Sequence, residues 1–226
     1  MQFTVDGTAL TLEFSHCTVA GWTGRNKAAI QHHIDELAAI GVTPPSSVPL
    51  YYRVASGILT GENRIEVVGS GTSGEIEPFL VAHEGTMYIG LASDHTDRDL
   101  EAHSVALSKQ ACLKPVAATL WRFDEVAGHL DQLEMRSWIR EDDSDEWVLY
   151  QDGLVAAIRP LSDLIDGSKF VAAATGGKAA GMLCGTLGVV SGGVRPARAF
   201  KMELRDPVLN RVIAHEYDII ELPVIS

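Results

Sequence analysis

The sequence predicts a β-rich α+β fold with a few short helices. Most apolar segments are short runs rich in Val, Ile, Thr, Tyr and Phe, bounded by Gly, Pro, Asn or Asp, and such runs are typical of strands. Only one long segment has a clear helical period. The 226 residues contain neither an internal repeat nor a low-complexity linker, so we expect one domain over residues 1–226.

The first 20 residues predict a short N-terminal hairpin region. Two strands fit Gln2–Phe14, because Asp6-Gly7 within this segment is a preferred pair for a tight hairpin turn. We expect a buried strand over Cys17–Gly21 next, which ends at the glycine.

The clearest helix is predicted from Lys27 to Ile40. Its apolar residues recur at helical spacing and form one stripe: Ile30, Ile34, Leu37 and Ala38. Gly41 is an end signal, and the proline-rich segment 44–49 excludes regular structure directly after it.

The remaining elements are shorter. An apolar, β-prone run opens with Glu75-Ile76-Glu77. Other strands are predicted at Leu50–Val54, Arg64–Val68, Thr86–Leu91, Met135–Ile139, Trp147–Tyr150, Met182–Cys184, Phe200–Leu204 and Val212–Ile220. Helical segments are predicted at Asp99–Lys109, with Thr96 or Asp99 near its start, at Leu120–Leu133 and, as one turn, at Leu161–Ile165. The acidic run 140–146 is expected to be a solvated loop.

Composition excludes some classes of function. A formal net charge of −12 argues against a nucleic-acid surface, because neutralising phosphates requires a basic footprint. No apolar run is long enough to span a bilayer and no secretion signal opens the chain, so we expect no membrane partner. The three cysteines are widely spaced and odd in number, which fits structural thiols in a reducing compartment. We therefore expect a cytoplasmic protein.

Three carboxylates predict a metal site. On an extended chain Glu75 and Glu77 point to the same face with Cα atoms about 6–7 Å apart, so their charges repel unless a cation lies between them. Asp94 follows the next strand and supplies a third oxygen donor. Oxygen-only ligands favour Mg²⁺ or Mn²⁺, with Ca²⁺ as a third candidate. The competing interpretation is an exposed acidic pair on a strand edge and an aspartate that shapes a turn.

A second pair of residues lies in the predicted helix. His33 and Glu36 are three residues apart and so occupy neighbouring positions on one face. A carboxylate that orients an imidazole and raises its basicity makes a general base for water. The adjacent His32 and Asp35 blur this assignment, and the alternative is an amphipathic helix with an ordinary polar face.

Taken together, five motifs resemble the fumarylacetoacetate hydrolase family, in a divergent bacterial branch. They occur in this order: G-R-N at 24–26, H-x-x-E at 33–36, E-x-E at 75–77, D-x-T-x-R-D at 94–99 with L-S-K at 107–109, and the G-T of L-C-G-T-L-G at 185–186. The resemblance runs from about Gly24 to Leu222. It implies a mixed β-sandwich roll and a homodimer that acts on small oxo-acids.

The resemblance also implies a role for each matched residue. Glu75, Glu77 and Asp94 match metal ligands, and His33 with Glu36 matches a water-activating dyad on a lid helix. Lys109 matches a catalytic lysine. The predicted substrate ligands are Arg25, Arg53 and Thr186, the last in the turn that holds a substrate carboxylate.

The sequence departs from the family pattern at three places that bear on the substrate. Arg53-Val54 stands where the family commonly has Lys-Pro, and the fork geometry of arginine favours a different carboxylate position. Leu187 replaces a proline after the G-T turn. The segment 121–145 has no counterpart in the family pattern.

Other candidates are assigned structural roles. His95 alternates away from Asp94, and His103 is expected to be packed or partly exposed. Cys112 and Cys184 lack an accompanying basic dyad, so neither is expected to be a nucleophile. Arg98 is expected in a local ion-pair and cap cluster, or as a support for Asp94.

The expected activity is a metal-dependent hydrolase or lyase of C–C bonds in 2-oxo or 1,3-dicarbonyl acids. Acylpyruvate hydrolysis and oxaloacetate-type decarboxylation are both covered by the resemblance. A hydratase or isomerase on the same fold, and a non-catalytic binder of a metal and a dicarboxylate, are the alternatives.

Overall fold

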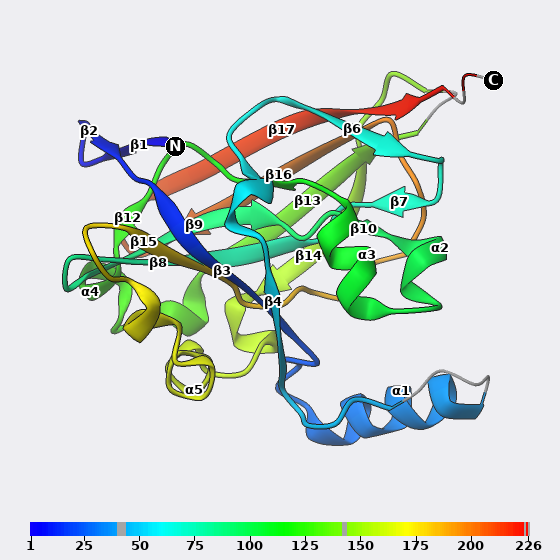
Figure 1. The fold of residues 1–226 in the computed structure, drawn as a ribbon, viewed down its shortest axis with the longest axis horizontal. Coiled ribbons are helices and arrows are strands. Elements are labelled where there is room, and N and C mark those ends of the chain that lie inside the picture. Colours follow the sequence, from blue (N-terminus) through cyan, green and yellow to red (C-terminus); the bar gives the residue numbers. More distant parts are fainter. Residues whose placement is uncertain (40–43, 142–143, 224, 226) are drawn as a thin grey trace.

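The computed structural model describes residues 1–39, 44–141, 144–223 and 225, and two packed sheets form its body (Figure 1). The larger sheet has six strands in the order β12-β9-β8-β15-β3-β4. Their bounds are Trp121–Arg122, Thr86–Ser93, Ile76–His83, Ala179–Leu183, Phe14–Gly21 and Leu50–Val54. This sheet is mixed, because β15 runs parallel to β3 and antiparallel to β8.

The second sheet has five strands in the order β14-β13-β16-β17-β6. Their bounds are Val148–Leu154, Glu134–Arg140, Ala199–Asp206, Arg211–Leu222 and Arg64–Val68. Burial alternates along β13 and β6, as expected for strands with one face on a core and one in water.

The main hydrophobic core lies between the two sheets. One contiguous cluster of buried residues includes Leu80 and Ile89 from the six-stranded sheet and Met135, Met202 and Ile213 from the five-stranded sheet. These side chains come from facing surfaces, so the arrangement is a sandwich. The predicted β-rich α+β class is confirmed.

The N-terminal hairpin covers the other face of the six-stranded sheet. Strands β1 (Gln2–Val5) and β2 (Thr8–Thr11) pair around Asp6-Gly7, whose φ angles are both positive, as predicted for this turn. Phe3 is buried in a second cluster with residues of β3, β8 and β9.

Short pairs of strands connect the sheets to the helices. β5 (Leu59–Thr60) pairs in parallel with β11 (Lys114–Pro115), and β7 (Thr72–Ser73) pairs with β10 (Thr96–Asp97). Two of these short strands, β7 and β10, flank the carboxylate-bearing segments described below. Four 3-10 turns complete the described elements: η1 (Ser56–Ile58), η2 (Leu130–Gln132), η3 (Val155–Ala157) and η4 (Phe170–Ala173).

The predicted helix over Asp99–Lys109 is two helices. α2 (Arg98–Glu101) is capped by Asp97, whose carboxylate accepts the N–H of Leu100 at 2.9 Å. α3 (Val105–Ala111) starts after its own cap, Ser104. Asp97 belongs to the local cap cluster that the sequence indicates around Arg98, whereas the cap at Ser104 was not predicted. The break between the two helices turns α3 towards the site.

The predicted helix over Leu120–Leu133 is wrong in its first part. Trp121 and Arg122 form strand β12, which pairs with Ile89 and Tyr88 of β9. Only α4 (Phe123–Val126) and η2 are helical after it. Pairing with a distant strand therefore overrides the local helical preference at the edge of the sheet.

Two further helices stand at the periphery. α5 (Leu161–Ser168) exceeds the single turn predicted there, and Lys169 ends it in a left-handed conformation with φ of 55°. α1 (Lys27–Ala39) confirms the predicted helix up to residue 39, while Ile40 and Gly41 lie outside the described residues. Figure 1 shows α1 standing apart from both sheets.

Candidate metal centre

The three predicted metal ligands meet at one end of the β8–β9 hairpin. Antiparallel pairing places Ile76 opposite Ser93, and the Asp94 N–H donates to the Glu75 carbonyl at 2.9 Å. This register places Glu75 and Glu77 beside Asp94, which is the first residue after β9. One carboxylate oxygen from each of Glu75, Glu77 and Asp94 lies within 4.8 Å of the others.

Glu75, Glu77 and Asp94 form a triad, and Glu77 is the more deeply buried of its two glutamates. Its side chain is buried and accepts the Gly185 N–H at 2.7 Å. Burial raises the pKa of Glu77 well above its usual value, and the nearby Asp94 raises it further. Gly185 has φ of +99°, and a Cβ there would lie 1.7 Å from the Thr23 hydroxyl, so only glycine fits.

Asp94 is completely buried between two lysines. Lys109 contacts one carboxylate oxygen, and Lys114 lies 3.1 Å from the other. Burial alone would raise the pKa of Asp94, but the two ammonium groups outweigh it and hold this pKa at about 2. Burial would lower the pKa of Lys109, but Asp94 raises it above its usual value, with smaller contributions from Glu75 and Glu77. Asp94 and Lys109 are therefore both charged at neutral pH.

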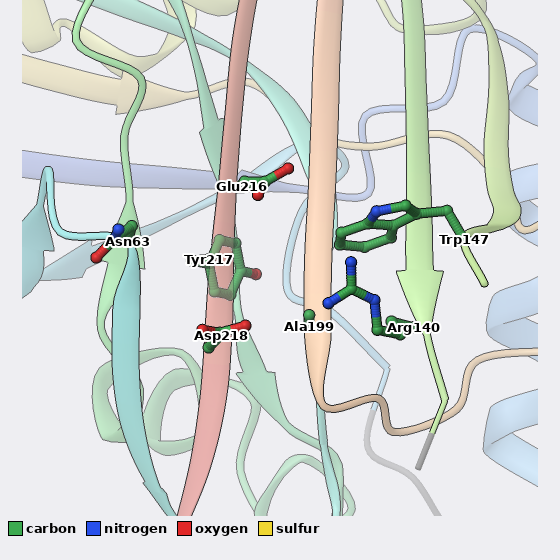
Figure 2. Close-up of a pocket in the computed structure, with 7 residues that line it drawn as sticks. All are labelled: Asn63, Arg140, Trp147, Ala199, Glu216, Tyr217 and Asp218. Atoms are coloured by element: carbon green, nitrogen blue, oxygen red, sulfur yellow. The ribbon is translucent and has the colours of Figure 1, made fainter. Parts of the chain in front are cut away.

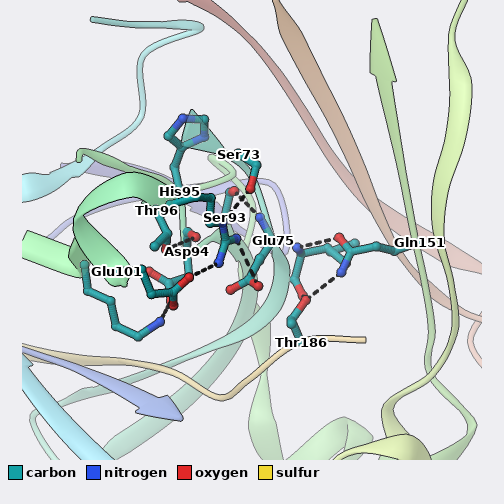
Figure 3. A network of polar contacts seen from close by, with 12 residues as sticks. Ser73, Glu75, Ser93, Asp94, His95, Thr96, Glu101, Gln151 and Thr186 are labelled. Atoms are coloured by element: carbon teal, nitrogen blue, oxygen red, sulfur yellow. Dashed lines mark hydrogen bonds and ion pairs between the residues drawn. The ribbon is translucent and has the colours of Figure 1, made fainter. Parts of the chain in front are cut away.

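Glu75 is held from the other side by Arg98. The Arg98 guanidinium lies 3.1 Å from Glu75, donates to Glu101 at 2.8 Å and donates to the Ser73 hydroxyl at 2.7 Å. The sequence suggested that Arg98 joins a local ion-pair and cap cluster or supports Asp94; the structure pairs it with Glu101, in the same short helix, and with Glu75. Figure 3 shows Asp94 and Glu101 close to Glu75 within one polar network.

The triad fits a divalent cation of the magnesium type. Ligand oxygens about 2.0–2.6 Å from one ion lie within roughly 4–5 Å of one another, and the observed spacing satisfies this limit. The donors are all carboxylates, which hard cations prefer. Two of the three carboxylates, Glu77 and Asp94, are buried. Burial and the nearby Asp94 raise the pKa of Glu77, so its ionised form would gain from a further cation.

The Thr186 side chain of the G-T turn contacts the backbone between Glu75 and Glu77. The Thr186 hydroxyl donates to the Ile76 carbonyl at 2.7 Å and accepts from the Gln151 amide at 2.8 Å. Its only proton is therefore used inside the protein. Figure 3 shows Gln151 and Thr186 on the side of Glu75 opposite to Asp94.

A buried polar chain supports the end of β9. Ser93 lies 2.8 Å from the Tyr217 hydroxyl, and the two ring nitrogens of His95 lie 3.0 Å from the hydroxyls of Tyr217 and Thr72. Burial, followed by repulsion from Lys114 and Arg98, lowers the pKa of His95 to about 3. His95 is thus a neutral structural residue, as the sequence indicated.

The predicted dyad lies on α1. His33 and Glu36 both fall within this helix, so the helical spacing on which the prediction depends is confirmed. Their side chains lie outside the described part of the structure. The catalytic assignment of both residues stays a prediction.

The two predicted substrate arginines have partners elsewhere. Arg25 forms a two-pronged pair with Asp131, with both distances at 2.7 Å, and its Nε donates to the Ile158 carbonyl at 2.8 Å. Arg53 donates to three backbone carbonyls, those of Ser15, Cys17 and Val54. Neither guanidinium is paired with a carboxylate of the triad.

The cysteines have the inert character that the sequence predicted. Cys17, Cys112 and Cys184 are buried and unbridged. Burial raises the pKa of Cys17 to about 12 and that of Cys112 to about 11, and it raises the pKa of Cys184 as well. Thiols with raised pKa values are poor nucleophiles at neutral pH.

His103 is exposed on the segment between α2 and α3.

A pocket of about 70 Å³ lies on the five-stranded sheet and does not include the triad (Figure 2). Arg140 stacks on the Trp147 ring at 4.3 Å on one side, and Glu216 and Asp218 of β17 line the other. The pocket drawn in Figure 2 thus contains none of the triad carboxylates, although the buried Tyr217 beneath it also contacts Ser93 and His95.

Sequence reasoning missed Lys114 and Gln151. Both are completely buried, and both contact residues of the site. A lysine inside the apolar run L-K-P-V was a usable signal, because buried lysines are rare unless they are paired. Gln151 carries no comparable signal, because glutamine is frequent on exposed strand positions.

Comparisons with solved structures identify the fold. A candidate fumarylacetoacetate isomerase/hydrolase from Oleispira antarctica has 14% identity and a TM-score of 0.62, with 97% of this chain and 100% of that chain covered. A 2-keto-3-deoxy-D-arabinonate dehydratase complexed with magnesium and 2,5-dioxopentanoate has 12% identity and a TM-score of 0.63, covering 94% and 75%. The fumarylacetoacetate hydrolase from Exiguobacterium antarcticum has 13% identity and a TM-score of 0.54, covering 95% and 81%. At these identities the similarity concerns the fold.

Two further findings concern curated proteins and membrane-spanning helices. No curated protein matches the chain at a significant level. None of the helices among the described residues has the length and apolar character needed to cross a membrane.

The family model described as "Protein of unknown function (DUF2848)" matches residues 20–217. The chain therefore belongs to this family, and its fold is that of the fumarylacetoacetate hydrolases.

Proposed function

We propose that the protein is a divalent-metal-dependent hydrolase or lyase that acts on C–C bonds of small 2-oxo or 1,3-dicarbonyl acids. The observation that carries this proposal is the triad of half-buried Glu75 and buried Glu77 and Asp94, with the Lys109 ammonium on Asp94. A metal site that holds a permanent cation beside its carboxylates is suited to a substrate that develops negative charge.

The triad would hold Mg²⁺ or Mn²⁺, with Ca²⁺ as a third candidate. When bound, such an ion supplies Lewis-acid polarisation of a carbonyl oxygen and a template for a 2-oxo-acid. Lys109 stabilises the enolate charge that develops as the C–C bond breaks. Its raised pKa keeps the side chain a charged ammonium, and its burial shields that charge from water. Lys114 keeps Asp94 ionised from the far side.

Proton transfer is assigned to α1. His33, oriented by Glu36, would deprotonate the water that attacks the distal carbonyl. The position of α1 apart from the sheets suits a helix that closes over a bound substrate (Figure 1). Arg25, Arg53 and Thr186 stay predicted substrate ligands. To reach an oxo-acid, Arg25 would have to leave Asp131, Arg53 would have to leave its carbonyls, and the Thr186 hydroxyl would have to release the Ile76 carbonyl.

Calorimetry tests the metal centre. Metal-stripped protein is titrated with Mg²⁺ and Mn²⁺, with and without oxalate as a mimic of a pyruvate enolate. We expect binding that oxalate tightens and that Glu75→Ala abolishes. Glu101→Gln is the matched control, because it removes the other carboxylate on Arg98 but no ligand of the triad. If the wild-type protein takes up neither cation with oxalate present, the proposal is wrong.

A second candidate is a hydratase, dehydratase or isomerase on the same site. The structural similarity to a magnesium-bound keto-acid dehydratase favours it. His33→Ala separates the two reactions. Loss of a general base lowers the rate of hydrolysis by about 10²–10⁴-fold, whereas isomerisation or loss of water, neither of which uses an attacking water, keeps most of its rate. A hydratase does use water, and it is recognised by a product whose carbon chain is intact. Acylpyruvates, oxaloacetate and 3-deoxy-2-oxo sugar acids form the substrate screen.

A protein that binds a metal and oxalate but turns over none of these substrates would be the non-catalytic binder. The expected homodimer and cytoplasmic location also stay predictions. Light scattering of the purified protein tests the first, and fractionation of cells tests the second.

A further inference from the structure

Gln151 of β14 occupies the junction between the two sheets directly behind the metal centre. Its side chain is completely buried and makes four hydrogen bonds. The carboxamide oxygen accepts from the Ile76 N–H at 3.0 Å and from the Ser137 hydroxyl at 2.9 Å. The amide nitrogen donates to the Thr186 hydroxyl at 2.8 Å and to the Leu187 carbonyl at 2.7 Å. All four hydrogen-bonding positions of a glutamine are therefore filled.

Three of these four bonds lead to the metal centre. Ile76 is the residue between Glu75 and Glu77, so its N–H determines where the strand holds both carboxylates. Thr186 and Leu187 form the turn that presents the Gly185 N–H to Glu77. Thr186 returns to the Ile76 carbonyl and closes the ring of contacts. Ser137 alone leads away, into β13.

Packing alone does not require this side chain. Methionine would fill a similar volume in the core without the cost of burying an amide. A fully satisfied polar group in a sandwich core fixes the relative placement of the segments that it joins. Here those segments are the strand that carries the ligands and the turn that hydrogen-bonds one of them.

We propose that Gln151 is a positioning residue of the metal centre: it sets Glu75 and Glu77 against the Gly185-Thr186 turn so that the triad holds its cation. This inference deepens the proposed function and depends on it. Gln151 itself does not touch the cation. Its effect passes through Ile76 and Thr186.

The test compares Gln151→Met with Ser137→Ala. Ser137→Ala is the matched control, because it removes a bond to the same carboxamide oxygen but leaves the three bonds towards the site. We measure the Mn²⁺ dissociation constant by calorimetry and the melting temperature by differential scanning calorimetry. We expect Gln151→Met to weaken Mn²⁺ binding by about 10–100-fold, as loss of a support behind a metal ligand does. Ser137→Ala should stay within about twofold of wild type even if its melting temperature falls.

A second variant covers the case in which Gln151→Met does not fold. Thr186→Val removes the hydroxyl that links Gln151 to Ile76 and keeps the shape of the side chain, and it should weaken Mn²⁺ binding to a similar extent. Equal Mn²⁺ affinities in folded Gln151→Met and wild type would overturn the inference. So would an equal loss in Ser137→Ala, because general destabilisation would then explain both. If wild type itself binds no Mn²⁺, the proposed metal centre fails, and this inference fails with it.

Discussion

At the residue scale, Asp94 is the centre of charge in the site. Two buried lysines share its carboxylate, and a third cation, Arg98, holds Glu75. A buried ion pair contributes little compared with an apolar core of the same volume, but removal of one partner leaves an uncompensated charge. Asp94 therefore has a structural role that is separate from metal binding, and it can be measured without metal.

Asp94→Asn should destabilise the protein strongly. The substitution leaves Lys109 and Lys114 without their counter-charge, and we expect a loss of about 3–5 kcal/mol in the free energy of unfolding. Urea unfolding in the presence of a chelator measures this loss. Asp152→Asn is the control, because Asp152 pairs with Arg136 at 2.9 Å on the surface, where about 1 kcal/mol or less is expected. Similar small losses in both variants would contradict the structural role of Asp94.

At the element scale, the β16–β17 hairpin depends on one buried aspartate. One oxygen of Asp206 accepts the N–H groups of Val208 and Leu209 at 3.0 Å and lies 3.0 Å from His129. The other oxygen accepts from Arg211 at 3.2 Å. Burial opposes ionisation, but these donors outweigh it and lower the pKa of Asp206 below its usual value.

The lowered pKa determines the sign of a pH effect. Ionised Asp206 stabilises the fold above the pKa of an unfolded aspartate, about 4, and this contribution is lost as the pH falls through the lower folded value. Asp206→Asn should cost about 1–3 kcal/mol at pH 7 and less below pH 4. Denaturant unfolding of both proteins at several pH values checks this. Asp218→Asn, an exposed position on the same strand, should show no such convergence; if it does, the hairpin network is not the cause.

Helix α1 should open independently of the sheets. Asn26 caps it, accepting the N–H groups of Ala28 and Ala29 at 3.1 Å, while Lys27 and Gln31 are exposed. Among the side chains of α1 that the structure describes, Ile34 is buried, Ile30 is half-buried and the others are exposed. A helix with few buried side chains opens at a lower free energy than the core strands. Native-state amide exchange should therefore show α1 exchanging faster than β8. Asn26→Ala should increase exchange in α1 by about five- to tenfold, the equivalent of a lost cap, and leave β8 unchanged. Equal protection of α1 and β8 would contradict a separable helix.

At the scale of the whole molecule, metal binding should stabilise the fold by mass action. A ligand at 100 times its dissociation constant stabilises the native state by about 2.7 kcal/mol. In a chain of this length that corresponds to a rise of roughly 5–10 °C in melting temperature. Melting curves with Mn²⁺, and again after a chelator, measure the rise and its reversal. Glu75→Ala should melt at the same temperature with and without Mn²⁺; a rise in this variant would place the cation outside the triad.

The placement of the triad was accessible from sequence because it is local. Glu75 and Glu77 share a face by strand alternation, and a hairpin between residues 76 and 93 brings Asp94 beside them. Each step involves neighbours in the chain or a single tight turn. The same reasoning applies to α1, whose period and cap lie within one segment.

The surroundings of the triad were decided only by the tertiary structure. Lys114 reaches the site from the short β5–β11 pair and Gln151 from β14 of the five-stranded sheet, and both contacts join segments that are distant in the chain. For the same reason the first part of the predicted helix at 120–133 is a strand, since β9 offers backbone partners to Trp121 and Arg122. Local sequence therefore determined which side chains are candidate metal ligands and which lie on one face of α1. Packing between distant strands decided the charge, the hydrogen bonds and the burial of the groups that would perform it.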